Sequence, residues 1–115
     1  MTAMSEPIPQ PWETRHARFD FSEGHGYKYR SIIVLAMRLD GLLVAMVTGV
    51  ANKLSLEHDH PIREWEAAGL DKPSIARLDR IAEIPAGYLG VAGRIGCLTD
   101  GDINAIKAIL AKITQ

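Results

Sequence analysis

Polar and apolar residues alternate along much of the chain, a pattern that predicts half-buried β-strands. From Trp12 to Phe21, apolar side chains fall on one face, while charged residues and a histidine fall on the other. The segment from Ser31 to Leu39 is apolar on both faces, as a central strand would be. Asp40-Gly41 then gives a strong hairpin signal before a returning strand at 42–48. The first half therefore predicts an antiparallel sheet, with a flexible loop at 22–26.

A further extended segment, 74–84, lies in the second half of the chain and ends at Pro85-Ala86-Gly87. We expect its apolar side chains to share one face and its charged side chains to share the other. The apolar set is Ala76, Leu78, Ala82 and Ile84, and the charged set is Arg77, Asp79 and Glu83.

Helical signals flank this strand. Pro61 suits the first position of a helix and Gly69 its far end, so 62–68 is expected to form a short helix with Trp65 facing inward. The polar stretch 49–59 before it is expected to be a loop with a short strand near 54–57.

The C-terminal segment carries the clearest helical signal. Thr99 and Asp102 resemble a capping box, and apolar residues recur at helical spacing after them. These residues are Ile103, Ile106, Leu110 and Ile113. Strands followed by a closing helix predict a mainly β, α+β fold, namely a small antiparallel β-barrel with a C-terminal helix.

Composition supports one small domain. The chain has 115 residues, the size of one domain, which we expect over 12–115. The first eleven residues carry three prolines, so we expect a loose N-terminal leader over 1–11. No apolar run reaches the length of a membrane span, and the leader lacks the features of a signal peptide. The lone cysteine, Cys97, cannot form a disulfide within the chain, which suits a reducing cytoplasm.

Arg77 and Asp79 are the first candidates for chemistry. They lie two apart in a predicted strand, so both side chains are expected to emerge on one face. A guanidinium beside a carboxylate can hold and act on a phosphodiester, but the same pair can be an ordinary surface ion pair. The net charge of −1 requires any nucleic-acid contact to be local, at clusters such as 15–30 and 72–80.

Metal and cofactor chemistry has little support. The four histidines and one cysteine lack zinc-ligand spacing, and His58-Asp59-His60 is either a weak chelator or a solvated turn. The glycine-containing stretches fit no phosphate-binding loop. An enzyme built on this chain is therefore expected to work without a metal or cofactor.

Several short motifs occur in the order typical of one family. They are Arg18-Phe19-Asp20-Phe21, Lys28-Tyr29-Arg30, a strand ending in Thr48, the turn from Trp65 to Leu70, Lys72-Pro73-Ser74 before Arg77 and Asp79, and the stretch from Gly93 to Thr99 before the last helix. Over about 100 residues, the chain resembles the PemK/MazF family of toxin–antitoxin ribonuclease toxins.

This resemblance implies an SH3-like barrel that forms a homodimer and cuts single-stranded RNA at short motifs, as a metal-independent mRNA interferase in the cytoplasm. It also implies a cognate antitoxin protein that blocks the RNA groove. The alternative is a non-catalytic or degenerate binding module on the same fold, acting on a protein target.

The resemblance also implies roles for individual residues. Arg77 and Asp79 would act as acid, base and stabiliser, and Arg30 would bind the phosphate that Thr48 orients. His25 would be a general base or an exposed loop residue. The expected RNA contacts are Lys28, Tyr29, Lys72 and Ser74.

Two positions depart from the family pattern. Ser31 replaces the usual proline after the arginine, and Gly49 replaces the usual serine after the threonine. Loss of the proline is expected to loosen the strand entry that aims Arg30.

Overall fold

The computed structural model describes residues 9–20, 26–49 and 58–113. The elements, in chain order, are β1 (Glu13–Asp20), β2 (Tyr27–Arg38), β3 (Gly41–Gly49), β4 (Asp59–Pro61), β5 (Ser74–Ile84), the 3₁₀ turn η2 (Ala86–Tyr88), β6 (Leu89–Cys97) and α1 (Asp100–Ile113). The fold is α+β, as the alternating strands and the closing helical pattern predicted.

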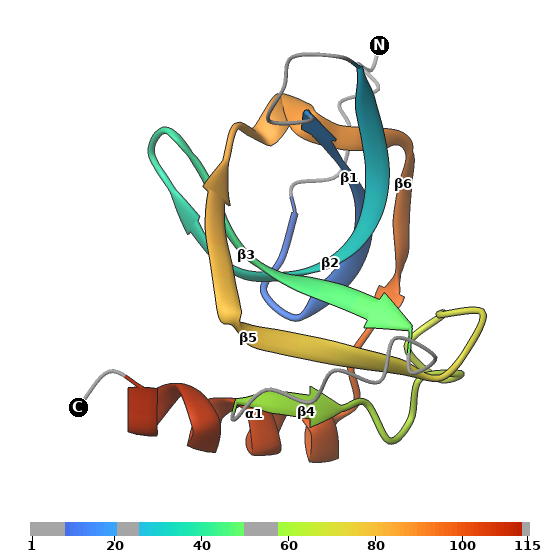
Figure 1. The fold of residues 1–115 in the computed structure, drawn as a ribbon, viewed down its shortest axis with the longest axis vertical. Coiled ribbons are helices and arrows are strands. Elements are labelled where there is room, and N and C mark those ends of the chain that lie inside the picture. The colour runs from blue at the N-terminus through green and yellow to red at the C-terminus, as the bar shows by residue number, and fades with distance from the viewer. Residues whose placement is uncertain (1–8, 21–25, 50–57, 114–115) are drawn as a thin grey trace, which may run out of the picture.

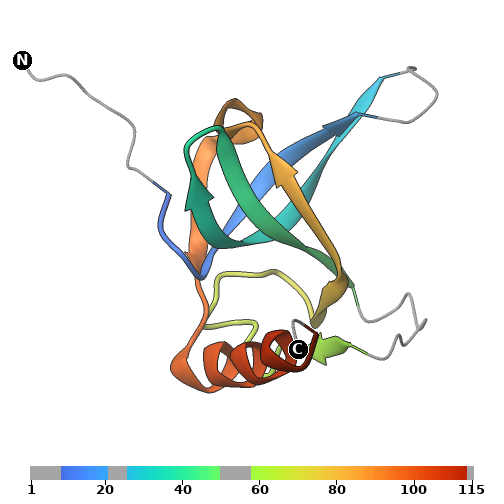
Figure 2. The same cartoon turned by 90° about the vertical axis from the view of Figure 1, so that its left-hand side faces the viewer.

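The strands form one six-stranded antiparallel sheet in the order β4-β5-β3-β2-β1-β6. The sheet is strongly bent into a small barrel-like shape, and α1 lies below it along β4 and the first half of β5 (Figure 1). The view turned by 90° shows the same arrangement, with the barrel above and the helix beneath (Figure 2). The predicted small barrel with a C-terminal helix is confirmed.

The predicted hairpin between the second and third strands is also confirmed. Arg38 pairs with Gly41 across a tight turn. A Cβ atom at Gly41 would stand 2.3 Å from the carbonyl oxygen of Ile84, so only glycine fits where this turn meets the end of β5.

Strand β5 turns a sharp corner (Figure 1). Ala45 on β3 pairs with Ile81, but the next residue, Met46, pairs with Arg77. Leu78, Asp79 and Arg80 therefore form an insertion in β5, which bends the strand and reverses which residues face each side.

The predicted common face of Ala76, Leu78, Ala82 and Ile84 is wrong for this reason. Ala76 and Leu78 pack in one apolar cluster, whereas Ile84 and Ala82 belong to the other.

Among the described residues, two apolar clusters stabilise the fold. One lies within the curved sheet and includes Ala17, Ile32, Val34, Leu42, Val44 and Ile84. The other joins the opposite face of the sheet to α1 and includes Ile33, Ala45, Val47, Ile62, Leu78 and Ile106. Strand β2 contributes to both clusters, which explains its apolar character on both faces.

Residues 63–69 form hydrogen-bonded turns instead of the predicted short helix. Pro61 belongs to β4 and pairs with Ile75, so it does not begin a helix. Trp65 packs against the second cluster, as expected. The turn closes at Gly69, whose φ of +86° is in the left-handed region.

Asp102 accounts for the ordered turn. Its carboxylate accepts hydrogen bonds from the backbone N–H groups of Arg63 at 2.9 Å and Glu64 at 3.0 Å. The predicted capping box with Thr99 is therefore wrong, because Asp102 directs its carboxylate to a segment far away in the sequence. The helix α1 was predicted correctly.

The predicted short strand near 54–57 lies outside the described residues. Strand β6 was not predicted, because its glycine-rich sequence lacks a clear alternation.

Candidate functional site

Three strand ends meet at a groove on one side of the sheet. Because β3 runs antiparallel to β2 and β5, the end of β3 lies beside the beginnings of both neighbours. The groove has a volume of about 240 Å³ and is closed on one side by the segment before β5. It is lined by Tyr29, Arg30, Ser31, Val47, Thr48, Gly49, Leu70, Asp71, Lys72 and Ser74.

Most of the predicted RNA-contacting residues in the described part of the chain converge in this groove. Arg30 and Lys72 are exposed cations, and half of the surface of Tyr29 is accessible. Thr48 adds a hydroxyl group to the same lining. This combination suits a phosphodiester, since cations and hydroxyls bind phosphate and an exposed aromatic ring can stack on a base. Among the described residues that line the groove, Asp71 is the one carboxylate.

Ser74 lies at the edge of the groove but directs its hydroxyl inward. Its Oγ donates a hydrogen bond of 2.8 Å to the backbone carbonyl of Lys72, and the residue is buried. Ser74 therefore fixes the backbone that carries Lys72, rather than presenting its hydroxyl to the groove.

Arg77 and Asp79 lie farther along β5, outside the lining of the groove. Arg77 pairs with Met46 on one side and Asp59 on the other, and only 8% of its surface is exposed. It falls on the same sheet face as Thr48, as a diagonal neighbour at about 7–8 Å. Arg77 is therefore not an exposed surface residue.

Asp79 lies at the corner of β5, where it binds His58. His58 Nδ1 is 2.7 Å from Asp79 Oδ1, and the backbone N–H of His58 donates to Oδ2 at 3.2 Å. The hydrogen bond from the His58 ring lowers the pKa of the Asp79 carboxyl below its ordinary value of 3.8. The carboxylate is thus held ionised and oriented by a histidine that the sequence placed in either a chelating cluster or a solvated turn.

The two histidines around Asp59 have separate partners. His60 is buried, with its Nε2 2.8 Å from Asp102 Oδ1, while His58 contacts Asp79. The weak His58-Asp59-His60 chelate is therefore not formed. Among residues 9–20, 26–49 and 58–113, no group of three His, Cys, Asp or Glu side chains is placed to hold a metal ion.

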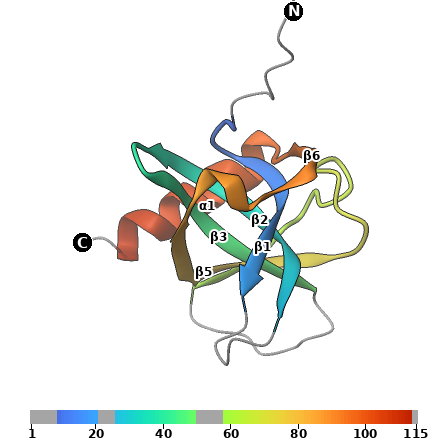
Figure 3. The same cartoon turned by 90° about the horizontal axis from the view of Figure 1, so that it is seen from above.

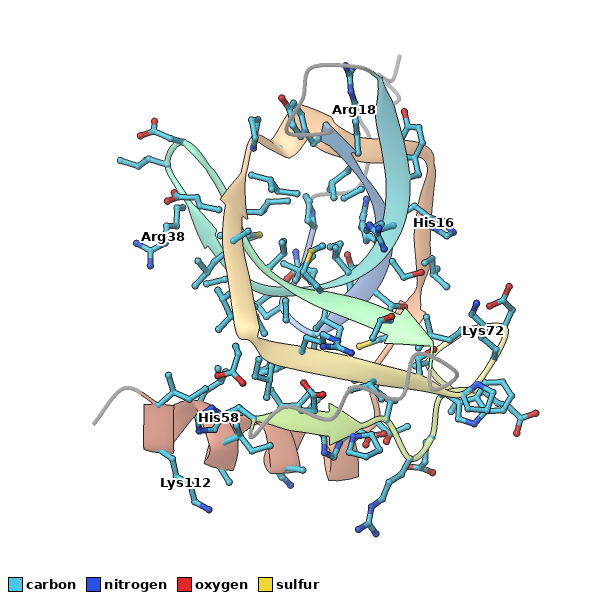
Figure 4. All side chains as sticks on the ribbon, viewed as in Figure 1. His16, Arg18, Arg38, His58, Lys72 and Lys112 are labelled. Carbon is cyan, nitrogen blue, oxygen red and sulfur yellow. The ribbon has the colours of Figure 1, made fainter. Side chains whose placement is uncertain are left out.

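The groove beside Lys72 and the His58–Asp79 pair lie at two separate places on the molecule. Lys72 stands at one end of the first half of β5, and His58 lies toward the other end, above α1 (Figure 4). The view from above shows β1 and β2 crossing over β3 and β5 (Figure 3). His25 lies outside the described residues. The backbone of Lys28 is in β2, opposite Phe19, but its side chain is also outside the described part.

Comparison with solved structures shows which known fold this chain resembles. The chain is similar to the structure titled Mycobacterium tuberculosis toxin MazF-mt6, with a TM-score of 0.68 and 23% sequence identity. The match covers 87% of this chain and 93% of that chain. The chain has a MazF-like fold.

The MazF-like fold agrees with the resemblance read from the ordered motifs. Neither a protein-family model nor a curated protein matches the sequence. In the described part of this MazF-like chain, no helix is long and apolar enough to cross a membrane.

Proposed function

We propose that the chain is the toxin of a type II toxin–antitoxin system and acts as an endoribonuclease on single-stranded RNA. The observation that carries this proposal is the groove in which Arg30, Thr48 and Lys72 gather on a MazF-like fold. The groove supplies local positive charge on a chain whose net charge is only −1.

Cleavage in this proposal uses the substrate's own 2′-hydroxyl. Its oxygen attacks the neighbouring phosphorus while a base takes its proton, the bond from phosphorus to the 5′-oxygen breaks, and an acid protonates that oxygen. The products are a 2′,3′-cyclic phosphate and a 5′-hydroxyl. No oxidant, metal or cofactor is required for the balance of this reaction.

The groove residues provide the charge and the orientation. Arg30 binds a non-bridging phosphate oxygen and stabilises the negative charge that develops during attack. The Thr48 hydroxyl, from the adjacent strand, orients the same phosphate. Tyr29 offers its exposed ring to a neighbouring base.

The Arg77 and Asp79 region provides the proton transfer in this proposal. Arg77 stabilises charge from the same sheet face as Thr48. Asp79 is already held by His58, so a base at this position acts as a His58–Asp79 pair. Cleavage requires that this pair come within hydrogen-bond reach of the 2′-hydroxyl.

The test is cleavage of a mixed-sequence single-stranded RNA in EDTA, with the product ends mapped. Arg30→Ala and Thr48→Val are each expected to lower the rate by about 100-fold, since each removes a group that contacts the reacting phosphate. Arg38→Ala is the matched control, because Arg38 is exposed at the opposite end of β2, away from Lys72 (Figure 4). Equal cleavage by all four proteins would contradict the assignment of the groove.

A second candidate function is a binding module without cleavage. Its support is the burial of Arg77 and the engagement of Asp79 by His58, which keep both residues out of the groove lining. Wild-type protein that binds the RNA but leaves it intact would favour this candidate, and loss of binding in Arg30→Ala would then map its surface.

The proposal includes the partners of such a toxin, namely a cognate antitoxin and a second copy of the chain, in the cytoplasm. An apolar groove between the sheet and α1, lined by Trp12, Leu35, Leu43, Ile81 and Leu110, supports a protein partner. Light scattering after size exclusion measures the oligomeric state directly.

A further inference from the structure

Gly49 leaves room for another side chain at the end of β3. A Cβ atom at this position would stand 3.1 Å from Lys72 Cε and 3.4 Å from Lys72 Nζ. The lysine side chain therefore lies across the glycine, in space that a larger residue would claim. Gly49 is not among the described glycines with positive φ, so its backbone conformation does not itself demand glycine.

The backbone of Lys72 is fixed on both sides. Ser74, directly opposite Gly49 in the sheet, donates its hydroxyl to the Lys72 carbonyl at 2.8 Å. Pro73, between them, restricts the connecting backbone. The base of the lysine side chain is thus anchored, and the contact across Gly49 decides where its ammonium group lies.

The position of the Lys72 ammonium group matters because Arg30 and Thr48 line the same groove. Thr48 precedes Gly49 on β3, and Arg30 lines the same groove from β2. The Lys72 ammonium group lies over residue 49, and the Arg30 guanidinium and the Thr48 hydroxyl line the same groove. Two cations that line one groove can bind the phosphates of a nucleic-acid strand that lies in it.

We propose that Lys72 is the second phosphate-binding cation of the groove and that Gly49 is a positioning residue, acting by leaving the space across which Lys72 reaches. This inference rests on the proposed function in taking single-stranded RNA as the ligand. It goes beyond that function because it links residue 49 of β3 to the position of the Lys72 ammonium group.

The experiment measures binding separately from cleavage. The probe is a fluorescent mixed-sequence RNA with 2′-O-methyl groups throughout, which has no 2′-hydroxyl to attack and remains intact. Affinity is followed by anisotropy at several salt concentrations for wild type, Lys72→Gln, Gly49→Val and the double variant. Lys112→Gln is the matched control, because Lys112 is exposed in the last turn of α1 and points away from the groove (Figure 4).

Lys72→Gln is expected to weaken binding by about fivefold and to reduce the slope of log affinity against log salt by about 0.7, the value for one phosphate contact on a single strand. Gly49→Val is expected to do the same, because its branched side chain displaces Lys72 while suiting a strand. The double variant is expected to bind no more weakly than Lys72→Gln, since Gly49 acts through the lysine. Lys112→Gln is expected to remain within about twofold of wild type.

Gly49→Ser, which adds only a small side chain, replaces Gly49→Val if the valine variant does not fold. Additive losses in the double variant, or a wild-type salt slope in Lys72→Gln, would overturn the inference. Wild type that binds the probe but fails to cut ordinary RNA would reject the nuclease alone, leaving the Gly49–Lys72 coupling measurable. Wild type that does not bind the probe would reject both.

Discussion

His58 and Asp79 form a pair at the corner of β5, with His58 Nδ1 2.7 Å from Asp79 Oδ1. The backbone N–H of the same histidine donates to the other carboxylate oxygen, so both oxygens are engaged by one residue. A carboxylate bound to Nδ1 fixes the orientation of an imidazole ring. The ring stays accessible, since 26% of the side-chain surface of His58 is exposed.

If this pair supplies the base for RNA cleavage, its two members act as one unit. His58→Gln and Asp79→Asn are each expected to lower the cleavage rate by about 100-fold. The double variant is expected to be no slower than either single variant, because each removes the function of the pair. Rates are measured on a short single-stranded RNA, with Asp100→Asn as the control for loss of an exposed aspartate. Full activity in Asp79→Asn would contradict a role for the pair.

The buried Asp102 predicts a pH-dependent contribution to stability. Burial raises the pKa of its carboxyl, but the N–H groups of Arg63 and Glu64 and the His60 ring outweigh this effect and lower the pKa below 3.8. Asp102→Ala is expected to lower the free energy of unfolding at pH 7 by about 3 kcal/mol, because one buried and two part-buried hydrogen bonds lose their partner. Urea unfolding of both proteins measures this difference.

The pH dependence of that difference follows from the sign of the pKa shift. A carboxyl whose pKa is lowered in the folded state stabilises the protein fully above 3.8 and loses this effect as pH falls through the folded value. The gap between wild type and Asp102→Ala is therefore expected to shrink below pH 3.8. Asp100→Ala, an exposed change in the same helical turn, is expected to cost less than about 1 kcal/mol at any of these pH values. A similar loss in both variants would contradict the network.

Alanine substitutions at Gly69 and at Gly101 are expected to have different effects on the stability of the fold. A Cβ atom at Gly69 would lie 2.4 Å from the Ile95 carbonyl oxygen, and the φ of +86° disfavours any larger residue. Gly69→Ala is expected to destabilise the fold by about 1–3 kcal/mol. Gly101→Ala in α1, where a Cβ meets nothing within 4 Å, is expected to be neutral or to stabilise by up to about 1 kcal/mol. Thermal and urea unfolding of the two variants decide the point, and equal stability would refute the close packing of Gly69 on β6.

Local pattern was enough to predict the main strands and the last helix. The segment 74–84 has the bounds of β5, and the apolar spacing after Thr99 leads directly to α1. Such patterns succeed because each strand or helix must bury one set of side chains at its own period. The short helix at 62–68 failed because Pro61 is used by β4 and Asp102 orders the turn from outside the segment.

The candidate site was predicted only in part. Arg30, Thr48 and Lys72 were identified from motif order, and the structure brings them to one groove. His58 was set aside, because its partner Asp79 lies 21 positions away in the sequence. Gly49 was noted as a departure from the family pattern, but its contact with Lys72 could not be predicted, because the two residues lie far apart in the sequence.

The sequence by itself determined the strands β1, β2, β3 and β5, the closing helix, and which cations and hydroxyls are available for phosphate. Only the tertiary structure decided which side each residue of β5 faces, because the insertion of Leu78, Asp79 and Arg80 reverses the alternation at the corner. It also decided the partners of His58, Asp102 and Lys72. Periodicity reports burial along one segment, whereas these contacts depend on how distant segments are brought together by the register of the sheet.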